Sequence, residues 1–276
     1  MSVRRVGLVP HPHRDTAAEL VEQATAFLEK HDIEVRCPRT PGGTDLDTTG
    51  LDVVISLGGD GTMLRAVDTA YQAGVAVLGV NVGQMGYLTE VEPSEFDTAL
   101  ERLVTGDYEV AERMVLEIDV ESAGSARGRW FALNEAVVEK VHTGRLARLE
   151  VDINGTFFTT YAADGVIIAT PTGSTAYSFS ARGPIVSPRH RCLLLTPVSP
   201  HMLFDRSLVL SPEELLRFTV CDDRSVVLTA DGRELGELAA GDTVSCRGGD
   251  RSARIVTFGP RDFHQILKAK FGLADR

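Results

Sequence analysis

Residues 53–62 read V-V-I-S-L-G-G-D-G-T, an apolar run of strand length that ends in three glycines around a single carboxylate. Apolar residues then recur every three or four positions from Met63 to Tyr71, and Gly74 follows. The stretch therefore predicts a strand, a tight turn and a helix that ends at this glycine. Such a turn lets backbone N–H groups approach a phosphate, and the helix N-terminus adds partial positive charge. The residues indicated as a phosphate site are Gly58, Gly59, Gly61 and Thr62.

Asp60 stands in the middle of this turn, where a carboxylate repels phosphates unless it has a task. It can hold Mg²⁺, or accept the proton of a hydroxyl that attacks a phosphoryl group. The alternative is an ordinary tight turn, in which Gly and Asp are both common. The stretch matches neither the G-x-x-x-x-G-K-[ST] phosphate loop nor the G-x-G-x-x-G dinucleotide fingerprint.

The composition is that of an ordinary globular protein, with 43% hydrophobic and 24% charged residues among 276. This length allows two modest domains or one large one. The net charge of −11 argues against a general nucleic-acid-binding protein, because such proteins bind mainly by neutralising phosphates. The four cysteines have no C-x-x-C spacing, so neither zinc nor a disulfide framework is indicated. No signal peptide and no membrane span are visible, and we expect a cytoplasmic protein.

Up to Gly106, predicted strands alternate with predicted helices. This alternation implies a parallel sheet with helices on its faces and ligands at the carboxyl ends of its strands. A capping box, T-A-A-E at 16–19, is expected to open the first helix. The other expected segments are strands at 6–9, 33–37 and 75–80, a loop at 38–50 and a helix near 94–105.

Beyond Gly106 the periodicity changes from that of helices to that of strands. Apolar and charged residues alternate over 113–121, a loop is expected at 123–128 and a strand at 130–141. Asn154-Gly155 is the strongest hairpin signal in the chain. Further β-rich segments are expected at 166–169, 193–198, 208–210, 226–228 and 243–246, and a last helix at 262–271. We therefore expect an α/β N-terminal domain with a parallel sheet, at 1–106, and a β-rich C-terminal domain, at 107–250. The segment 251–276 is expected to return to the first domain.

Asn134 and Glu135 interrupt an otherwise apolar predicted strand. Neighbouring residues of a strand point to opposite faces, so at least one of these side chains is expected to face the interior. A buried amide or carboxylate needs a partner. The alternative is an exposed edge strand, where polar side chains are ordinary.

The run T-P-T-G-S-T-A-Y-S at 170–178 follows a β-branched strand and is dense in hydroxyl groups. A short helix is expected to open at Ser174 or Thr175. Hydroxyls and free N–H groups at such a bend can bind a ribose or a phosphate. A strand-to-helix turn with an N-cap is the simpler interpretation, and the density of hydroxyls favours a ligand site.

Four motifs together resemble those of the NAD kinase family: G-G-D-G-T at 58–62, G-V-N-V-G-Q-M-G-Y-L at 79–88, N-E at 134–135 and the run at 170–178. Their order and spacing match over nearly the whole chain, least clearly in the first fifty residues. The first motif is shared with diacylglycerol, sphingosine and phosphofructo-type kinases, whereas the last is far more specific. The resemblance implies transfer of the γ-phosphoryl group of ATP to the 2′-hydroxyl of the adenosine ribose of NAD.

The resemblance also implies a nucleotide site between the two domains, Mg²⁺ or another divalent cation, and a homo-oligomer, either a dimer or a tetramer. NAD and ATP are the expected partners, with no nucleic acid and no membrane. By this carry-over Asp60 is the proton acceptor, and the β-rich domain binds NAD. The residues implied to contact NAD are Asp60, Gly61, Arg65, Asn134, Glu135, Arg145, Asp164, Thr175, Ala176, Tyr177, Ser178, Phe179 and Ser180.

Three positions depart from the family pattern. Arg182 stands where the family usually has a glycine, and an arginine is strained there if the backbone needs a positive φ. Asp231-Gly232-Arg233 replaces a common Asp-Gly-Gln turn, and Tyr87 replaces the more usual Phe. None of the three departures changes Asp60, Asn134 or Glu135 themselves.

Two other functions remain open at this stage. A lipid kinase of the diacylglycerol type would share the turn at 58–62, although the chain shows no membrane-docking segment. A non-catalytic dinucleotide-binding module would keep the binding motifs without turnover. The sequence also leaves open whether polyphosphate can replace ATP as the donor, and whether NAD or NADH is preferred.

Overall fold

The computed structural model describes residues 3–40, 43, 45–83, 86–122, 125–142, 144–221, 225–259 and 262–273. Gln84 and Met85 of the motif at 79–88, and parts of the expected loops at 38–50 and 123–128, lie outside these residues. The chain forms two compact units, one of residues 1–112 with 253–276 and one of residues 113–252. Among the described residues, no helix is both long and apolar enough to span a membrane.

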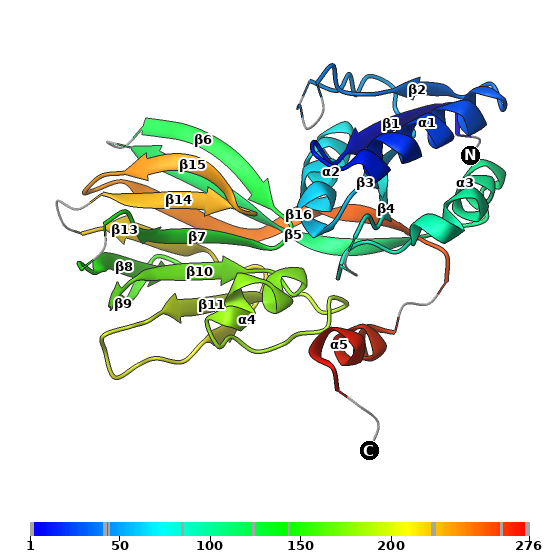
Figure 1. Ribbon diagram of the computed structural model, residues 1–276. Helices are drawn as coiled ribbons and strands as arrows, with labels where there is room; N and C mark the ends of the chain where they lie inside the picture. The colour runs from blue at the N-terminus through cyan, green and yellow to red at the C-terminus, as the bar shows by residue number, and fades with distance from the viewer. Residues whose placement is uncertain are drawn as a thin grey trace. The chain divides into compact units, whose positions relative to one another are not determined.

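The first unit is built on a parallel sheet, as the alternating pattern predicted (Figure 1). Its strands pair in the order β2-β1-β3-β4, and the C-terminal end of β16 pairs in parallel with β4. Every residue of β3 and β4 is buried, which is why both strands read as continuous apolar runs. The bounds are β1 (Arg5–Pro10), β2 (Glu34–Arg36), β3 (Val53–Leu57), β4 (Ala76–Val80) and β16 (Thr243–Thr257).

Helices cover both faces of this sheet. α1 (Asp15–Glu29) and α3 (Phe96–Thr105), which follows the short η1 (Pro93–Glu95), bury apolar side chains in one cluster with β1, β3 and β4. α2 (Asp60–Ala73) packs on the other face, where Gly79 leaves room for Met63: a Cβ on this glycine would lie 3.0 Å from the Met63 sulfur. Gly74 ends α2 in left-handed conformation, at the position predicted, and Gly106 ends α3 in the same way. The expected capping box is wrong, because α1 begins at Asp15 with Arg14 as N-cap.

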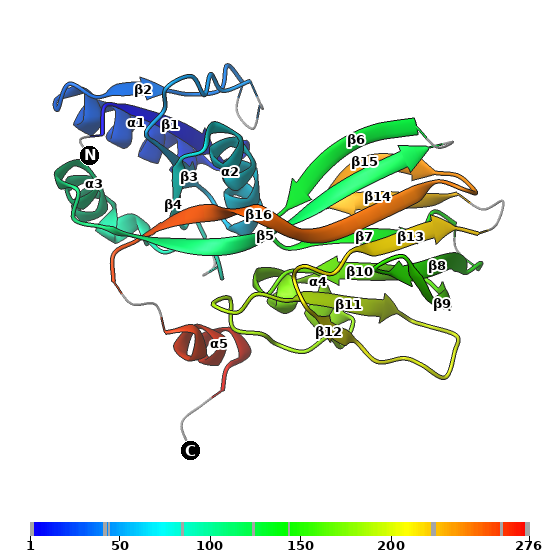
Figure 2. The same ribbon diagram turned by 180° about the vertical axis from the view of Figure 1, so that it is seen from behind.

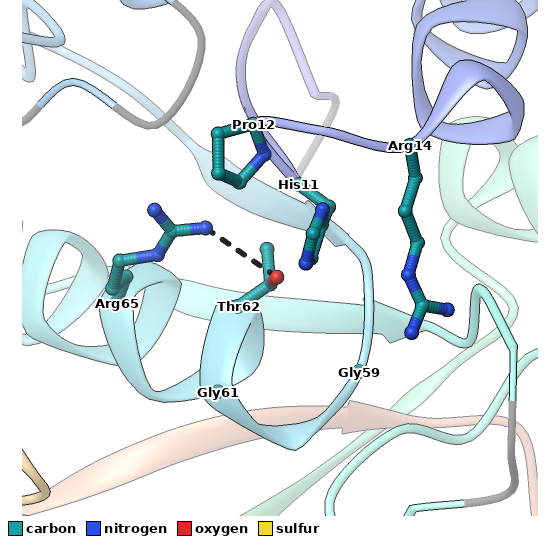
Figure 3. Close-up of a pocket in the computed structure, with 7 residues that line it drawn as sticks. All are labelled: His11, Pro12, Arg14, Gly59, Gly61, Thr62 and Arg65. Carbon is teal, nitrogen blue, oxygen red and sulfur yellow. Dashed lines mark hydrogen bonds between the residues drawn. The ribbon is translucent and has the colours of Figure 1, made fainter.

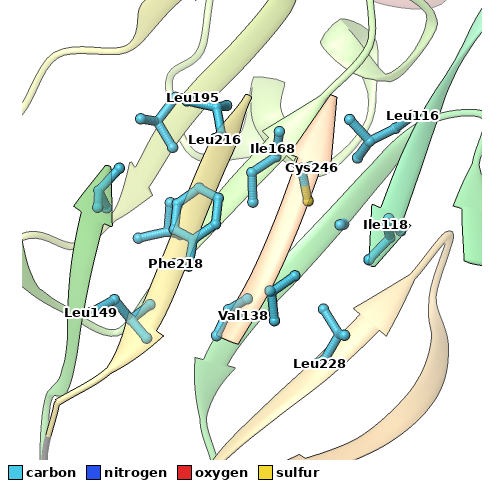
Figure 4. Packing of buried hydrophobic residues seen from close by; sticks show 14 of the residues in the cluster. Leu116, Ile118, Val138, Leu149, Ile168, Leu195, Leu216, Phe218, Leu228 and Cys246 are labelled. Carbon is cyan, nitrogen blue, oxygen red and sulfur yellow. The ribbon is translucent and has the colours of Figure 1, made fainter. Parts of the chain in front are cut away.

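The second unit is a sandwich of two antiparallel sheets whose facing side chains form one apolar core (Figure 4). One sheet has the order β12-β11-β10-β7-β14-β15, and the other contains the β9-β8-β13-β16 path together with β5 and β6. Phe218, Cys246 and Leu149 come from the second sheet, and Ile168 and Leu228 from the first. The bounds are β5 (Glu109–Ser122), β6 (Ser125–Ala132), β7 (Glu135–Lys140), β8 (Ala147–Ile153), β9 (Thr156–Ala163), β10 (Gly165–Ala169), β11 (Leu193–Val198), β12 (Leu208–Leu210), β13 (Leu216–Val220), β14 (Val226–Ala230) and β15 (Arg233–Leu238).

The single strand expected at 130–141 is wrong. β6 ends at Ala132 and β7 begins at Glu135, so the chain bends at Leu133 and Asn134. The loop expected at 123–128 is also wrong in its described part, since β6 already begins at Ser125. The bend matters because it places Asn134 and Glu135 at the start of a strand rather than within one.

The predicted hairpin is confirmed: Asn154 and Gly155 join β8 to β9 with φ of 55° and 77°, as a type I′ turn requires. The last helix is confirmed as α5 (Phe263–Phe271), capped by the Asp262 side chain. α5 belongs to the first unit, as does the C-terminal end of β16. The units change at residues 112 and 252, compared with the expected 106 and 250, because β5 and β16 are long strands that run from one unit into the other (Figure 2).

Candidate functional site

The glycine-rich turn opens α2, with Gly59 as its N-cap in extended conformation. The turn is fixed by the Gly58 N–H, which donates to Val80 O at 3.0 Å, and by the Thr62 N–H, which donates to Gly59 O at 2.9 Å. A Cβ on Gly58 would lie 2.3 Å from the Thr62 hydroxyl, whereas nothing lies within 4 Å of one on Gly59 or Gly61. The first glycine is therefore needed for packing, and the other two leave open space at the helix N-terminus.

That open space is part of a pocket of about 390 Å³. Its lining joins the helix N-terminus to the segment after β1, and Figure 3 shows the Arg65 and Arg14 side chains on opposite sides of the His11 ring. Two guanidinium groups beside a helix N-terminus form an anion site. The lining residues are His11, Pro12, Arg14, Gly59, Gly61, Thr62 and Arg65.

Sequence reasoning missed His11 and Arg14. A signal was present, since H-P-H-R at 11–14 follows the first strand at its carboxyl end. The pKa of His11 is lowered, first by burial and then by the charges of Arg14 and Arg65, so the imidazole is neutral at neutral pH. A Cβ on Gly83, whose φ is 120°, would lie 2.0 Å from an Arg14 guanidinium nitrogen. The absence of a side chain at Gly83 thus leaves the room that this guanidinium occupies.

Asp60 does not line the pocket. Its carboxylate accepts the Tyr87 N–H at 2.9 Å and the Leu88 N–H at 3.0 Å, which ties the segment after Gly86 to the start of α2. A Cβ on Gly86 would lie 2.1 Å from the carboxylate. The Lys270 ammonium group of α5 lies over the Tyr87 ring, 5.1 Å from the ring centroid. Each carboxylate oxygen keeps a second lone pair with which it can accept a further hydrogen bond.

In the second unit, the bend at Asn134 and Glu135 is held by Asp231. The Asp231 carboxylate accepts three backbone N–H groups, from Leu133 at 2.7 Å, Asn134 at 2.8 Å and Glu135 at 3.1 Å. Both predicted polar side chains are buried. The Asn134 carbonyl accepts the Thr170 N–H at 2.8 Å, and a Cβ on Gly173 would lie 2.2 Å from the same oxygen. The Asn134-Glu135 and 170–178 motifs are thus in contact.

The hydroxyl-rich run is mostly occupied by its own structure. η2 (Thr172–Thr175) and α4 (Tyr177–Ser180) follow β10, so the helix opens at Tyr177 rather than at Ser174 or Thr175. Ser174 Oγ bonds the backbone of Val186, and the fully buried Ser178 Oγ bonds Thr196. Tyr177, Phe179 and Ser180 are exposed, and Thr175 and Ala176 are half-buried. The side chains left for a ligand are therefore fewer than the sequence indicated.

Asp164 and Arg145 lie at the other end of β7 from Glu135. β7 pairs with β10 so that Glu135 is opposite Ala169 and Glu139 opposite Gly165, and Asp164 immediately precedes β10. The Asp164 carboxylate forms an ion pair with Lys140. Arg145 is exposed in the turn between β7 and β8. Within this unit the structure groups Asn134, Glu135 and the 170–178 run, and places the other two residues apart from them.

Two family models match the chain: the ATP-NAD kinase N-terminal domain over residues 38–108 and the ATP-NAD kinase C-terminal domain over residues 133–258. The chain belongs to the ATP-NAD kinase family. The enzyme class is therefore that of the NAD kinases, which are phosphotransferases, and these comparisons support neither a lipid kinase nor a non-catalytic module.

Relatives with NAD kinase names match over most of their length. The NAD kinase of Heliobacterium modesticaldum is 39% identical over 275 residues, which are 96% of this chain and 97% of that protein. NAD kinase 2 of Streptomyces avermitilis is 43% identical over 225 residues, 81% of this chain and 75% of that protein. Both domains of this NAD kinase family member thus have close counterparts.

Solved structures agree in fold. Yeast NADH kinase, determined with NADH, gives a TM-score of 0.89 at 24% identity and covers 100% of this chain and 89% of its own. An NAD kinase from Archaeoglobus fulgidus, determined with ATP, gives a TM-score of 0.73 at 25% identity over 97% of both chains.

One departure from the NAD kinase pattern has a visible consequence. Arg182 has a φ of 68°, in the left-handed region that favours glycine. The tight turn after α4 imposes this conformation, because the Gly183 N–H donates to Ser178 O at 2.7 Å. A residue that the family pattern gives as glycine is here an arginine under backbone strain.

Proposed function

We propose that this chain phosphorylates the 2′-hydroxyl of the adenosine ribose of NAD with ATP, giving NADP and ADP. The observation that carries the proposal is the G-G-D-G-T turn at the start of α2, which opens onto a cationic pocket, in a chain that both ATP-NAD kinase domain models match. Phosphoryl transfer asks the protein mainly for positioning and for neutralisation of phosphate charge. The pocket has the groups for both tasks.

The pocket at the N-terminus of α2 is the proposed site of the ATP phosphates. Arg14 and Arg65 neutralise phosphate charge, and Gly58, Gly59, Gly61 and Thr62 form the turn, of which Gly59, Gly61 and Thr62 line the pocket. Among the described residues, no cluster of three or more His, Cys, Asp or Glu side chains could hold a metal ion by itself. This fits Mg²⁺, which binds proteins through one or two carboxylates and otherwise through substrate phosphates and water. Asp60 is the carboxylate that could contact it.

Asp60 is the proposed proton acceptor for the attacking hydroxyl. A carboxylate that takes this proton contributes about 10²–10⁴-fold to the rate. The bonds from the Tyr87 and Leu88 N–H groups hold the carboxylate in place, so it is preorganised for a third bond. The NAD contacts proposed from the family pattern are Asp60, Gly61, Arg65, Asn134, Glu135, Arg145, Asp164 and Thr175 to Ser180.

The test is a coupled assay with purified protein, ATP, Mg²⁺ and NAD, in which an NADP-specific dehydrogenase reports NADP. Asp60→Asn is compared with Asp68→Asn, which removes a carboxylate from the same helix about two turns further on, where it accepts a hydrogen bond from the Gln72 side chain. We expect activity in the wild type and in Asp68→Asn and its near-complete loss in Asp60→Asn. No NADP from the wild type, or equal activity in all three proteins, would contradict the proposal.

The donor pocket has an independent readout in His11. Its pKa is lowered partly by Arg14 and Arg65, so a bound triphosphate that offsets these charges should raise it. NMR titration of the His11 ring with and without a non-hydrolysable ATP analogue measures the change, and Arg65→Gln should reduce it. Polyphosphate can be tested as a donor in the same way. An unchanged His11 pKa would place the triphosphate elsewhere.

A homo-oligomer, either a dimer or a tetramer, is part of the proposal, and its support lies in the second unit. Phe157 and Val209 are each 58% exposed, and Phe158 and Phe204 are exposed while in edge-to-face contact with each other. Phe158 and Phe204 are the pair in contact, and an exposed apolar patch marks an interface. Light scattering should give a multiple of the chain mass, and Phe157→Glu should reduce it. Cytoplasmic location is also proposed, and fractionation of cells would test it.

A further inference from the structure

Glu135 has an unusual environment for a carboxyl group. Only 8% of the residue is exposed, and its Oε2 atom has no hydrogen-bond partner among the described residues. The Tyr177 N–H at the start of α4 donates to the carboxyl group. A buried ionised oxygen without a partner is costly. One oxygen of Glu135 is therefore bonded, and the other has no protein partner in the described part of the chain and is open to a ligand.

Asp231 is a charged neighbour of Glu135 and has the opposite arrangement. Three N–H donors from Leu133, Asn134 and Glu135 converge on its carboxylate. Such convergence favours an ionised carboxylate. Two carboxyl groups in one buried place do not readily ionise together, because like charges repel strongly away from water. The one with three donors keeps the charge, which leaves the proton to Glu135.

The electrostatics point the same way. Burial first, and the Asp231 charge second, raise the pKa of Glu135 to about 8, against a smaller opposing effect of the Tyr177 N–H. Further along β7 the Tyr177 hydroxyl is affected by Glu139 and Asp164, and Asp164 is paired with Lys140 at the far end of the strand. The charge that acts on Glu135 is therefore that of Asp231, which disfavours a second negative charge.

We propose that Glu135 binds the dinucleotide as a neutral acid, donating a hydrogen bond from Oε2 to an acceptor atom of the ligand, while Asp231 remains the anion that fixes the bend. The acceptor is a ligand atom with an available lone pair, such as an unprotonated ring nitrogen of the purine or an oxygen of the ribose. The inference rests on the proposed function, since it specifies how that site recognises NAD. It makes Glu135 a donor, whereas a carboxylate would be an acceptor for ligand hydroxyls.

The two roles differ in the sign of their pH dependence. If the neutral acid binds, affinity is full below the pKa of Glu135 and falls as pH rises through it. With the pKa near 8, NAD should bind about tenfold more weakly at about pH 9 than at about pH 7, because each pH unit above the pKa removes a factor of ten of the neutral form. If the carboxylate binds, affinity should rise over the same range.

The experiment is a calorimetric titration of the full chain with NAD, without ATP, from about pH 6.5 to about pH 9.5. Glu135→Gln keeps an N–H donor at the same place and has no proton to lose, so we expect it to bind within about threefold of wild type near pH 7, with no fall at high pH. Glu135→Ala should bind at least about tenfold more weakly at every pH, a loss of about 1.4 kcal/mol. Glu139→Gln, on the same strand, is the matched control and should keep the wild-type profile.

Asp231→Asn is a second probe, because it removes the neighbouring charge but keeps an acceptor for the bend. The fall in NAD affinity should then begin at lower pH. The infrared difference between wild type and Glu135→Gln gives a readout without ligand. The carbonyl band of the protonated Glu135 carboxyl should be present at neutral pH and should weaken as the pH rises through about 8.

The inference is overturned if Glu135→Gln binds as poorly as Glu135→Ala near neutral pH, or if wild-type affinity is constant or rises with pH. A missing infrared band would overturn it equally. If the folded wild type binds NAD at no pH, the proposed function fails as well. That result differs from failure of the inference alone, in which NAD binds with the wrong pH profile.

Discussion

Asp60 has one structural task and one proposed catalytic task, and both use the same two oxygen atoms. The proposed chemistry needs a lone pair that can take a proton from a hydroxyl. The structure shows that the carboxylate also fastens the segment after Gly86, through the Tyr87 and Leu88 N–H groups. A variant that removes the charge therefore also disturbs the segment. The two effects have to be measured separately.

We predict that Asp60→Asn loses about 10²–10⁴-fold in turnover and, in addition, about 1–3 kcal/mol of stability. The stability loss is expected because one oxygen becomes an NH₂ group that faces a backbone N–H. Urea unfolding measures the second effect, and Asp68→Asn is the control in both assays. A stability equal to wild type with lost turnover would show that the two N–H bonds add little. Unchanged turnover would remove Asp60 from the chemistry.

Arg182 is the residue at which the sequence departs from its family and the backbone shows the cost. A left-handed conformation costs a residue other than glycine about 1–2 kcal/mol. A glycine at this position would remove that cost, but it would lose part of the gain because glycine has greater freedom in the unfolded chain.

We predict that Arg182→Gly raises the free energy of unfolding by about 0.5–1 kcal/mol. Arg206→Gly is the comparison, since Arg206 is an exposed arginine that is not among the residues with positive φ; it should lose a similar amount. Urea denaturation of the wild type, Arg182→Gly and Arg206→Gly measures both changes in the free energy of unfolding. Equal destabilisation by the two substitutions would mean that the Arg182 backbone is not strained.

Elements with a strong local signal could be predicted from the sequence, and those fixed by distant residues could not. β3, α2 and the β8–β9 hairpin follow from glycine positions and apolar spacing. The end of β6 at Ala132 and the start of β7 at Glu135 depend on Asp231, about a hundred residues later, whose carboxylate binds the backbone of the bend. The same holds for the pocket, where Arg14 contacts Gly83 only in the folded chain.

The bend between β6 and β7 should therefore depend on one side chain. We predict that Asp231→Ala lowers the free energy of unfolding by about 2–4 kcal/mol, because buried N–H groups of Leu133, Asn134 and Glu135 lose their acceptor. Asp231→Asn should recover part of this, since it keeps one acceptor oxygen. Asp152→Ala, at a half-buried position of the neighbouring sheet, is the control. A loss below about 0.5 kcal/mol for Asp231→Ala, the level of an ordinary surface substitution, would show that water replaces the carboxylate.

At the scale of the whole molecule, the first unit is discontinuous in sequence and the second is not. The N-terminal part of the first unit, residues 1–112, ends its parallel sheet at β4. The strand that covers β4 comes from the C-terminal end of β16, where Arg254 and Ile255 pair with Ala76 and Val77. Val256 is fully buried in the core of that unit. The first unit is therefore complete only when residues after 252 are present.

Contacts beyond the strand strengthen this dependence. The Phe258 N–H donates to Glu90 at 2.7 Å, and its carbonyl accepts from Arg102 at 3.0 Å. The Arg102 guanidinium also lies 4.7 Å from the Phe258 ring centroid. A chain cut at residue 112 would lose these contacts and expose the apolar edge of β4, and an exposed apolar edge strand favours aggregation.

We predict that residues 113–252 fold alone, whereas residues 1–112 do not. The two ends of the 113–252 fragment lie close together, since a Cβ on Gly249 would be 2.6 Å from the Val115 side chain, and its sandwich core is internal to the unit. Circular dichroism with thermal melting should show a cooperative transition for this fragment and none for 1–112. Joining 253–276 to 1–112 through a flexible linker should restore a cooperative transition, and the same fusion with Val256→Asp should not. A cooperative melt of 1–112 alone would mean that the N-terminal strands and helices hold their sheet without β16.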